Sequence, residues 1–312
     1  MFQIYLPIAG VSANFLAVAG VGLSVGLLSG MLGIGGGFLI TPLLIFLGVP
    51  TPVSIATGAN MAVATAAAAA QAHWLRGNVD VKMGTYLLVS GLAGSYAGVK
   101  VLVLLRSIGQ FDLFVSVSYA LLLGVVGAAM LVESLRAMRR ASRQKPGAAL
   151  AARRRRHLWI HHLPLKTRFR HSRLYISAIP PVVIGFIVGM LSSLMGVGGG
   201  FFVVPAMVYV LKMKTTVAVG TSLFMIVFVA GFTTFIQAVD VHSVDIVLAS
   251  ILIVAGVLGS QVGLKLGRNL AAEQLRAALA VIVLLVCIRV GLQLVIEPGE
   301  LYSLSGAAGV AE

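Results

Sequence analysis

Charged residues are scarce in this sequence. Only 10% of its 312 residues are Asp, Glu, Lys or Arg, against about one quarter in soluble domains. None of these four residue types occurs before Arg76. Together with a mean hydropathy of +1.03, this scarcity excludes an ordinary soluble domain. It predicts a polytopic, all-α membrane protein whose outer surface faces the lipid bilayer.

Cysteine and acidic residues are also few. The single cysteine, Cys287, cannot form an intrachain disulfide and belongs to no metal-ligand pattern. The nine Asp and Glu residues fall at or near predicted helix ends or in the tail, so no carboxylate relay for protons is evident within a span. His157, His161 and His162 have no cysteine or acid nearby. The sequence therefore predicts no metal, no cofactor and no catalytic constellation of an enzyme.

The basic residues are concentrated in one segment. Thirteen of the 23 Lys and Arg lie between Arg136 and Arg173. An excess of this kind in one connecting loop marks the loop as cytoplasmic, and it favours contact with lipid headgroups over nucleic-acid binding. The chain is thus predicted to have four parts: a first transmembrane repeat (1–133), a basic cytoplasmic loop (134–173), a second transmembrane repeat (174–297) and a tail (298–312).

Apolar stretches predict about eight transmembrane helices, and residues 1–11 read as an interfacial lead-in. Four full spans in each repeat would make the two repeats parallel. Two further apolar runs, 38–47 and 201–211, are too short to span alone, so an inverted arrangement stays open. The predicted spans are 14–32, 53–74, 84–105, 113–133, 174–195, 216–238, 245–266 and 274–296.

The strongest signal is a duplicated segment. Residues 22–42 (GLSVGLLSGMLGIGGGFLITP) and 185–205 (GFIVGMLSSLMGVGGGFFVVP) align without a gap, and 11 of the 21 paired positions are identical. The similarity continues downstream, where Gly91 and Gly94 match Gly256 and Gly259. Such a duplication is typical of transporters built from two repeats. The later glycines are expected to mark close contacts between helices.

Each duplicated segment reads as a helix that is broken at a cluster of four glycines. Backbone that is not helical survives at membrane depth only where it is buried in protein or lines a wet cavity. Phe38 and Phe201 would then begin short helices, whose N-termini present free N–H groups and about half a positive charge. We therefore expect the two clusters to bind a small anion. Its ligands would be Gly33, Gly35, Gly36, Gly37, Gly196, Gly198, Gly199 and Gly200.

Four polar residues on the helices that follow could add donors to this site, namely Thr57, Asn60, Thr221 and Ser222. Two alternatives involve no ligand. The glycines could serve only for close helix packing, and the hydroxyl groups could bond to the backbone of their own helices.

The glycine clusters that end in Pro42 and Pro205, followed by the segments of Thr57 and of Thr221-Ser222, resemble the sulfite exporter TauE/SafE family of membrane permeases. The resemblance covers nearly all of residues 14–296. It implies transport of sulfite, sulfonates or related anions across the bacterial cytoplasmic membrane. The first repeat departs from the second by having Gly58 where the second has Ser222.

The leading interpretation is an anion permease, not an enzyme, with a small anion and the lipid bilayer as its partners. The alternative is a membrane scaffold or sensor that acts through the basic loop. The sequence leaves open the substrate, the direction of transport, the coupling ion and the oligomeric state.

Overall fold

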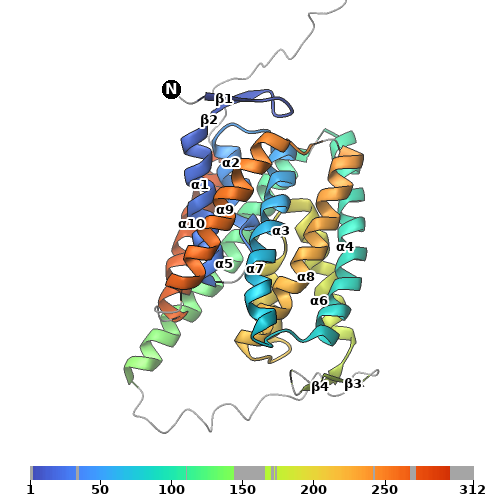
Figure 1. The fold of residues 1–312 in the computed structure, drawn as a ribbon, viewed down its shortest axis with the longest axis vertical. Coiled ribbons are helices and arrows are strands. Elements are labelled where there is room, and N and C mark those ends of the chain that lie inside the picture. Colours follow the sequence, from blue (N-terminus) through green and yellow to red (C-terminus); the bar gives the residue numbers. More distant parts are fainter. Residues whose placement is uncertain are drawn as a thin grey trace, which may run out of the picture.

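The computed structural model describes residues 3–32, 35–109, 111–143, 166–169, 172, 174–241, 243–267 and 272–295. Within these residues the chain forms a bundle of ten α-helices (Figure 1). The helices are α1 (Phe15–Leu32), α2 (Gly37–Phe46), α3 (Thr51–Leu75), α4 (Val81–Ser107), α5 (Phe111–Arg143), α6 (Ile179–Met195), α7 (Gly200–Tyr209), α8 (Thr215–Ile236), α9 (Ile246–Leu266) and α10 (Ala272–Val295), with a short π-helical segment, η4 (Gln237–Val241), after α8.

Six helices in the described part of the chain are long and apolar enough to cross a membrane: α1, α3, α4, α5, α8 and α9. The prediction of a helical, multi-pass membrane protein is therefore confirmed at the level of class, although these helices number six and not eight. The basic loop and the tail fall largely outside the described residues, and the histidines at 157, 161 and 162 fall wholly outside them.

Two small antiparallel hairpins correct the all-α prediction. β1 (Gln3–Leu6) pairs with β2 (Val11–Asn14), and β3 (Lys166–Phe169) pairs with β4 (Leu174–Ser177). The expected helix from residue 174 was wrong over β4, since α6 begins only at Ile179. The Pro180-Pro181 pair explains the late start, because a helix that continued back through residues 174–178 would need the N–H groups that proline lacks, whereas in the first turn they are not needed.

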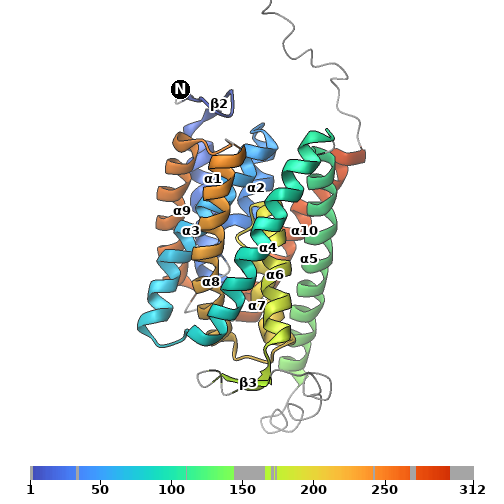
Figure 2. The ribbon, with the colours of Figure 1, turned by 90° about the vertical axis from the view of Figure 1, so that its right-hand side faces the viewer.

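The two halves of the chain enter the bundle from opposite ends. The hairpin β1–β2 lies at one end and β3–β4 at the other, and each leads directly into the next helix, α1 or α6 (Figures 1 and 2). Helix α2 lies toward the β1–β2 end and α7 toward the β3–β4 end (Figure 2). The starts of the two halves therefore lie at opposite ends of the bundle, which favours the inverted alternative. The count of four spans misled because α2 brings the chain back toward the end where α1 begins, so that α3, α4 and α5 alone carry it to the opposite end.

Helices of one half pack mainly against helices of the other. Helix α1 runs along α9, α4 along α6, α3 against α8, and α5 against α10. Glycines permit the closest approaches. A Cβ atom at Gly94 would collide with the carbonyl oxygen of Phe186, and one at Gly259 with that of Leu23. The prediction that these glycines mark close helix contacts is confirmed.

A buried carboxylate fastens the β1–β2 hairpin to the bundle. Asp245 caps α9, where its Oδ1 accepts the N–H groups of Val247 (3.0 Å) and Leu248 (3.1 Å). Its Oδ2 accepts the N–H groups of Ile8 (3.0 Å) and Ala9 (3.4 Å), in the turn of the hairpin. One side chain therefore both starts a helix and holds the hairpin over that end of the bundle.

Asp80 does the same at the opposite end. Its Oδ1 accepts the N–H group of Met83 at 3.1 Å, near the start of α4. Its Oδ2 accepts the N–H group (3.0 Å) and the hydroxyl group of Ser172, which lies between β3 and β4. Asp80 and Asp245 occupy matching positions in the aligned halves, so each end of the bundle has an equivalent anchor.

Candidate functional site: the crossing of the glycine segments

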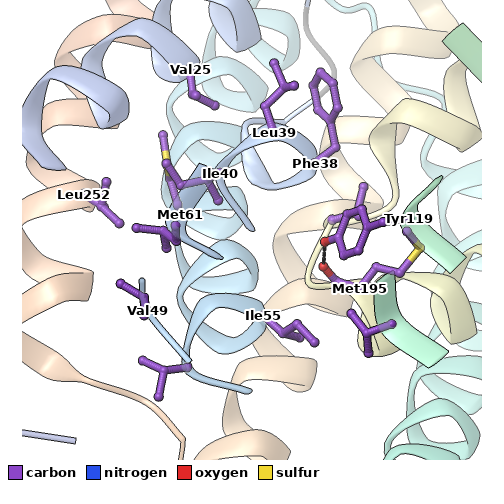
Figure 3. Packing of buried hydrophobic residues seen from close by; sticks show 14 of the residues in the cluster. Val25, Phe38, Leu39, Ile40, Val49, Ile55, Met61, Tyr119, Met195 and Leu252 are labelled. Carbon is purple, nitrogen blue, oxygen red and sulfur yellow. Dashed lines mark hydrogen bonds between the residues drawn. The ribbon is translucent and has the colours of Figure 1, made fainter. Parts of the chain in front are cut away.

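The two short helices begin beside each other in the protein core. The rings of Phe38 and Phe201, each the second residue of its helix, stack with centroids 4.7 Å apart and planes 7° from parallel. Both side chains are buried, and Figure 3 shows Phe38 within this core. The N-termini of α2 and α7 therefore meet, as the duplicated segment predicts.

Residues 35–37 and 196–200 lie against each other at a place that we call the crossing. Close packing requires glycine there. A Cβ atom at Gly37 would lie 2.6 Å from the carbonyl oxygen of Gly196 and 2.8 Å from that of Gly58. A Cβ atom at Gly198 would lie 2.5 Å from the Cβ atom of Ala62 on α3. At Gly196 the backbone is left-handed (φ +67°), and a Cβ atom would collide with the Ile55 carbonyl oxygen. These glycines are therefore required for close packing, whereas their role in anion binding stays a prediction.

Part of the backbone in the first cluster is already hydrogen-bonded. The Gly36 N–H group donates to the hydroxyl oxygen of Thr65 at 3.1 Å, and the Thr65 hydroxyl in turn donates to the Met61 carbonyl at 2.8 Å. Gly35 is left-handed (φ +75°) and has only Ile226 near the position of a Cβ atom. Gly33 lies outside the described residues.

The second cluster is arranged as a helix end followed by a helix start. Gly196 ends α6, and its N–H group donates to the Ser192 carbonyl at 2.8 Å. Gly199 precedes α7, and its carbonyl accepts the N–H groups of Phe202 (3.1 Å) and Val203 (3.0 Å). Gly200 is the first, buried residue of α7. The first N–H groups of a helix lack partners within the helix, so the start of α7 presents donors to the crossing.

The predicted hydroxyl groups are engaged elsewhere. The hydroxyl of Thr57 donates to the Val53 carbonyl at 2.7 Å, and that of Ser222 donates to the Val219 carbonyl at 2.8 Å. The hydroxyl oxygen of Thr221 accepts the N–H group of Asp80 at 3.0 Å. In this conformation the backbone-bonding alternative describes Thr57 and Ser222, while Thr221 joins α8 to the start of α4.

The remaining predicted polar residue, Asn60, is half-buried on α3. Gly58, two residues earlier, has a structural reason to differ from Ser222 in the other half. A Cβ atom at Gly58 would collide with the hydroxyl oxygen of Thr41 and would lie 2.9 Å from the Gly196 carbonyl oxygen. Only glycine fits there, so the missing hydroxyl follows from packing.

The sequence analysis missed Ser192 as a candidate site residue. Its side chain is buried, and its hydroxyl has no hydrogen-bond partner among the described residues. A Cβ atom at Gly199 would lie 3.8 Å from that of Ser192, which places this serine beside the second cluster. A buried polar group without a partner requires an explanation, such as a ligand or an ordered water. The sequence could have pointed to this residue, because both copies of the duplicated segment have serine at this position, Ser29 and Ser192.

Two other polar residues reach the end of α6. The hydroxyl of Tyr119, on α5, donates to the Met195 carbonyl (Figure 3). The Gln237 amide nitrogen donates to the Ser193 carbonyl at 3.1 Å, while its oxygen has no partner among the described residues. Both residues supply partners for carbonyl groups that the helix end leaves free. Neither has a counterpart in the repeat pattern, so the duplication could not reveal them.

The architecture defines the class of protein. Apolar helices that are interrupted in the core, where two helix N-termini meet, are typical of the framework of a membrane transporter. The sequence profile of the family described as "Sulfite exporter TauE/SafE" matches residues 18–290. The chain belongs to this family of membrane transporters.

Curated relatives agree with this assignment. A "Probable membrane transporter protein" of Xylella fastidiosa (strain 9a5c) is 29% identical over 263 residues, which cover 84% of this chain and 88% of the relative. YjnA and YunE of Bacillus subtilis, both named probable membrane transporter proteins, are each 26% identical. The YjnA match covers 85% of this chain and 94% of the relative, and the YunE match covers 91% and 98%. No solved structure matches the chain significantly.

Proposed function

We propose that this protein is a permease for a small sulfur oxyanion or organosulfonate, such as sulfite, and that it works by alternating access. The observation that carries the proposal is the meeting of the α2 and α7 N-termini in the core. Each helix start contributes a partial positive charge and free N–H groups, which suit a compact oxyanion. The family supports the choice of a sulfur-containing substrate.

We infer that the two halves are inverted repeats related by an approximate two-fold axis in the membrane plane. Under the alignment of the halves, α1 corresponds to α6 and α4 to α9. The contact of α1 with α9 then corresponds to that of α6 with α4, and both are extensive. Helix α3 also matches α8, and α5 matches α10, so each of these two contacts joins a helix to its own counterpart. Any two-fold axis between the halves produces this exchange, and the hairpins at opposite ends of the bundle favour an axis in the membrane plane.

The packed crossing corresponds to a closed state in the proposed cycle. Gly198 and Ala62 are in tight contact, so an anion at the second cluster requires α3 to move away from it. The anchors at Asp80 and Asp245 hold the hairpins at opposite ends. Releasing one hairpin at a time would open one end of the path while the other stays closed, as alternating access requires.

The charges at the two ends of the bundle support one orientation in the membrane. The turns at the β3–β4 end, where α3, α7 and α9 finish, carry more cations than the opposite end, where α4 finishes. Lysine and arginine favour the cytoplasmic side, so we place the β3–β4 end in the cytoplasm of a bacterial cell. The cations at that end include Arg76, Lys82, Lys212, Lys214 and Lys265.

Transport assays in proteoliposomes test the substrate. The purified protein should move radiolabelled sulfite, and unlabelled sulfoacetate or taurine should compete if organosulfonates are also substrates. Chloride in place of the competitor serves as a control for nonspecific anion effects. Folded protein that transports none of these anions would contradict the proposal.

Deletion of the basic segment distinguishes a permease from a scaffold or sensor that acts through this segment. A variant that lacks residues 144–165 keeps both strands of the β3–β4 hairpin. A permease retains its rate of sulfite flux in this variant. If the variant folds normally but loses all activity, the scaffold or sensor alternative gains support.

A further inference from the structure

A groove runs along the outer surface of the bundle between α4 and α6, away from the crossing. It encloses about 540 Å³ and is lined chiefly by Val89, Ala93, Val183 and Phe186. Val89 is 62% exposed and Val183 48%. Since α4 is long and apolar enough to span the membrane, apolar groups exposed there face lipid chains. The groove is therefore a recess in the lipid-facing surface.

The groove has the chemistry and the length for a hydrocarbon chain. Of the three lining residues that carry a hydroxyl group, Thr85, Tyr86 and Ser90, two turn it to their own helix: Thr85 donates to the Val81 carbonyl at 2.9 Å, and Ser90 donates to the Tyr86 carbonyl at 2.8 Å. The lining extends along α4 from Thr85 to Ala93, which is roughly 12 Å at the helical rise per residue. That length suits a large part of one phospholipid acyl chain.

A cation lies at the end of the groove nearest the β3–β4 hairpin. Lys82 precedes Tyr86 by one helical turn and therefore shares its face of α4. The Tyr86 ring meets the Phe169 ring edge-on at 5.9 Å, and the Lys82 ammonium lies 5.7 Å from the centre of that same Phe169 ring. The ammonium also donates to the Arg168 carbonyl at 3.2 Å, and its side chain is exposed. These contacts hold a positive charge at headgroup level.

The matching surface of the other half lacks both features. Gly91 and Gly94 align with Gly256 and Gly259 at a spacing of 165 residues. At the same spacing, Ala93 corresponds to Leu258, which is 55% exposed, and Lys82 corresponds to Val247. A bulky side chain thus stands where the groove has its smallest residue, and no cation accompanies it. These two differences distinguish the α4–α6 surface from the matching positions of the other half.

We propose that this groove binds one acyl chain of an anionic phospholipid and that Lys82 contacts the phosphate of its headgroup. The apolar lining excludes a polar solute, and the adjacent cation selects a negatively charged headgroup. The bound lipid would lie along both α4 and α6 and would brace the contact between the two halves.

Native mass spectrometry of the detergent-purified, full-length protein tests this proposal. The wild type should retain phosphatidylglycerol more strongly than phosphatidylcholine of the same chain length. Ala93→Leu fills the groove with the residue of the matching position and should weaken phosphatidylglycerol binding about tenfold, as when one or two methylene groups lose their burial. Lys82→Ala should remove the preference for phosphatidylglycerol and leave phosphatidylcholine binding unchanged.

The control is Leu258→Met on the matching surface, which should bind both lipids as the wild type does. Val183→Phe fills the groove from α6 and serves as the second variant if Ala93→Leu does not fold. Equal retention of phosphatidylglycerol by the wild type and by a folded groove-filling variant would overturn the proposal. So would equal retention of the two lipids by the wild type. Neither readout depends on sulfite transport.

Discussion

Helices α1 and α2 form one helical hairpin around the first glycine cluster, and α6 and α7 form a second around the other cluster. These first and second helical hairpins share a sequence pattern but differ in their hydrogen bonds. In the first, the hydroxyl of Thr65 accepts the Gly36 N–H group, and the hydroxyl of Thr41 donates to the Gly37 carbonyl at 3.4 Å. The residues that match these two threonines in the second half are Val229 and Val204, which have no hydroxyl. In the second hairpin the hydroxyl of Ser192, which matches Ser29 of the first, is buried and has no hydrogen-bond partner among the described residues.

This difference shows that duplicated motifs can divide their tasks. The first cluster satisfies part of its backbone with side chains of its own half, whereas the second leaves polar groups available beside the start of α7. We therefore infer that the second cluster carries more of the anion binding and the first more of the packing support. The predictions below test this division, from the largest expected effect to the smallest.

Alanine at two cluster glycines should have very different effects on folding, a large loss of stability at Gly196 and a small one at Gly36. In Gly196→Ala the new Cβ atom collides with the Ile55 carbonyl oxygen at a left-handed residue, which should destabilise the protein by more than about 3 kcal/mol. In Gly36→Ala the nearest atom is the Met61 terminal methyl at 3.4 Å, and φ is −75°, so the fold should persist. Thermal unfolding in detergent measures both. Equal melting temperatures would contradict the packing described at the crossing.

Removing the carboxylate anchors should release one hairpin at a time. Asp245→Ala leaves the N–H groups of Ile8 and Ala9 without their acceptor, and loss of the cap and these bonds should cost about 2 kcal/mol. Limited proteolysis should then cut within residues 3–14 in this variant and within 166–177 in Asp80→Ala. If each variant is cut at the other hairpin, or at neither, the anchors do not act as described.

Ser192→Ala should separate transport from stability. A hydrogen bond to a charged ligand is worth roughly 1.5–3 kcal/mol, so sulfite affinity should fall at least about tenfold. Folding should be unaffected, because the hydroxyl has no partner among the described residues. Ser29→Ala, the same change in the first hairpin, is the matched control and should affect affinity less. Equal losses in the two variants would show that the clusters do not divide their roles.

Thr65→Val should affect stability only modestly. The change keeps the shape of the side chain but removes the acceptor of the Gly36 N–H group, and it should cost about 1 kcal/mol. Val229→Thr makes the reverse change in the second half and should leave the melting temperature nearly unchanged. A larger loss in Val229→Thr than in Thr65→Val would reverse the assignment of packing support to the first hairpin.

The sequence predicted those features of the fold that depend on local pattern. The short helices expected at 38–47 and 201–211 are α2 (Gly37–Phe46) and α7 (Gly200–Tyr209), because four glycines followed by an apolar run interrupt a helix and then allow a new one. Both hairpins, β1–β2 and β3–β4, were missed, since strands of four residues are too short to show a clear alternation of apolar and polar residues.

The candidate site was harder to predict than the fold. The engagement of Thr57 with Val53 and the collision that excludes a side chain at Gly58 depend on which helices touch, and one sequence does not reveal those contacts. The identity of Ser29 and Ser192 was visible, but the availability of the Ser192 hydroxyl was not. Duplication locates the crossing, and only the packing distinguishes its two sides.

The most direct test of the central claim is anomalous diffraction from crystals soaked with 2-bromoethanesulfonate, whose bromine marks the position of the sulfonate. The account predicts a bromine peak at the crossing, beside Ser192 and the α7 start at Gly200, and weakened in Ser192→Ala crystals. A fully occupied bromine site elsewhere, with no peak at the crossing, would contradict the claim that the opposed helix N-termini bind the transported anion.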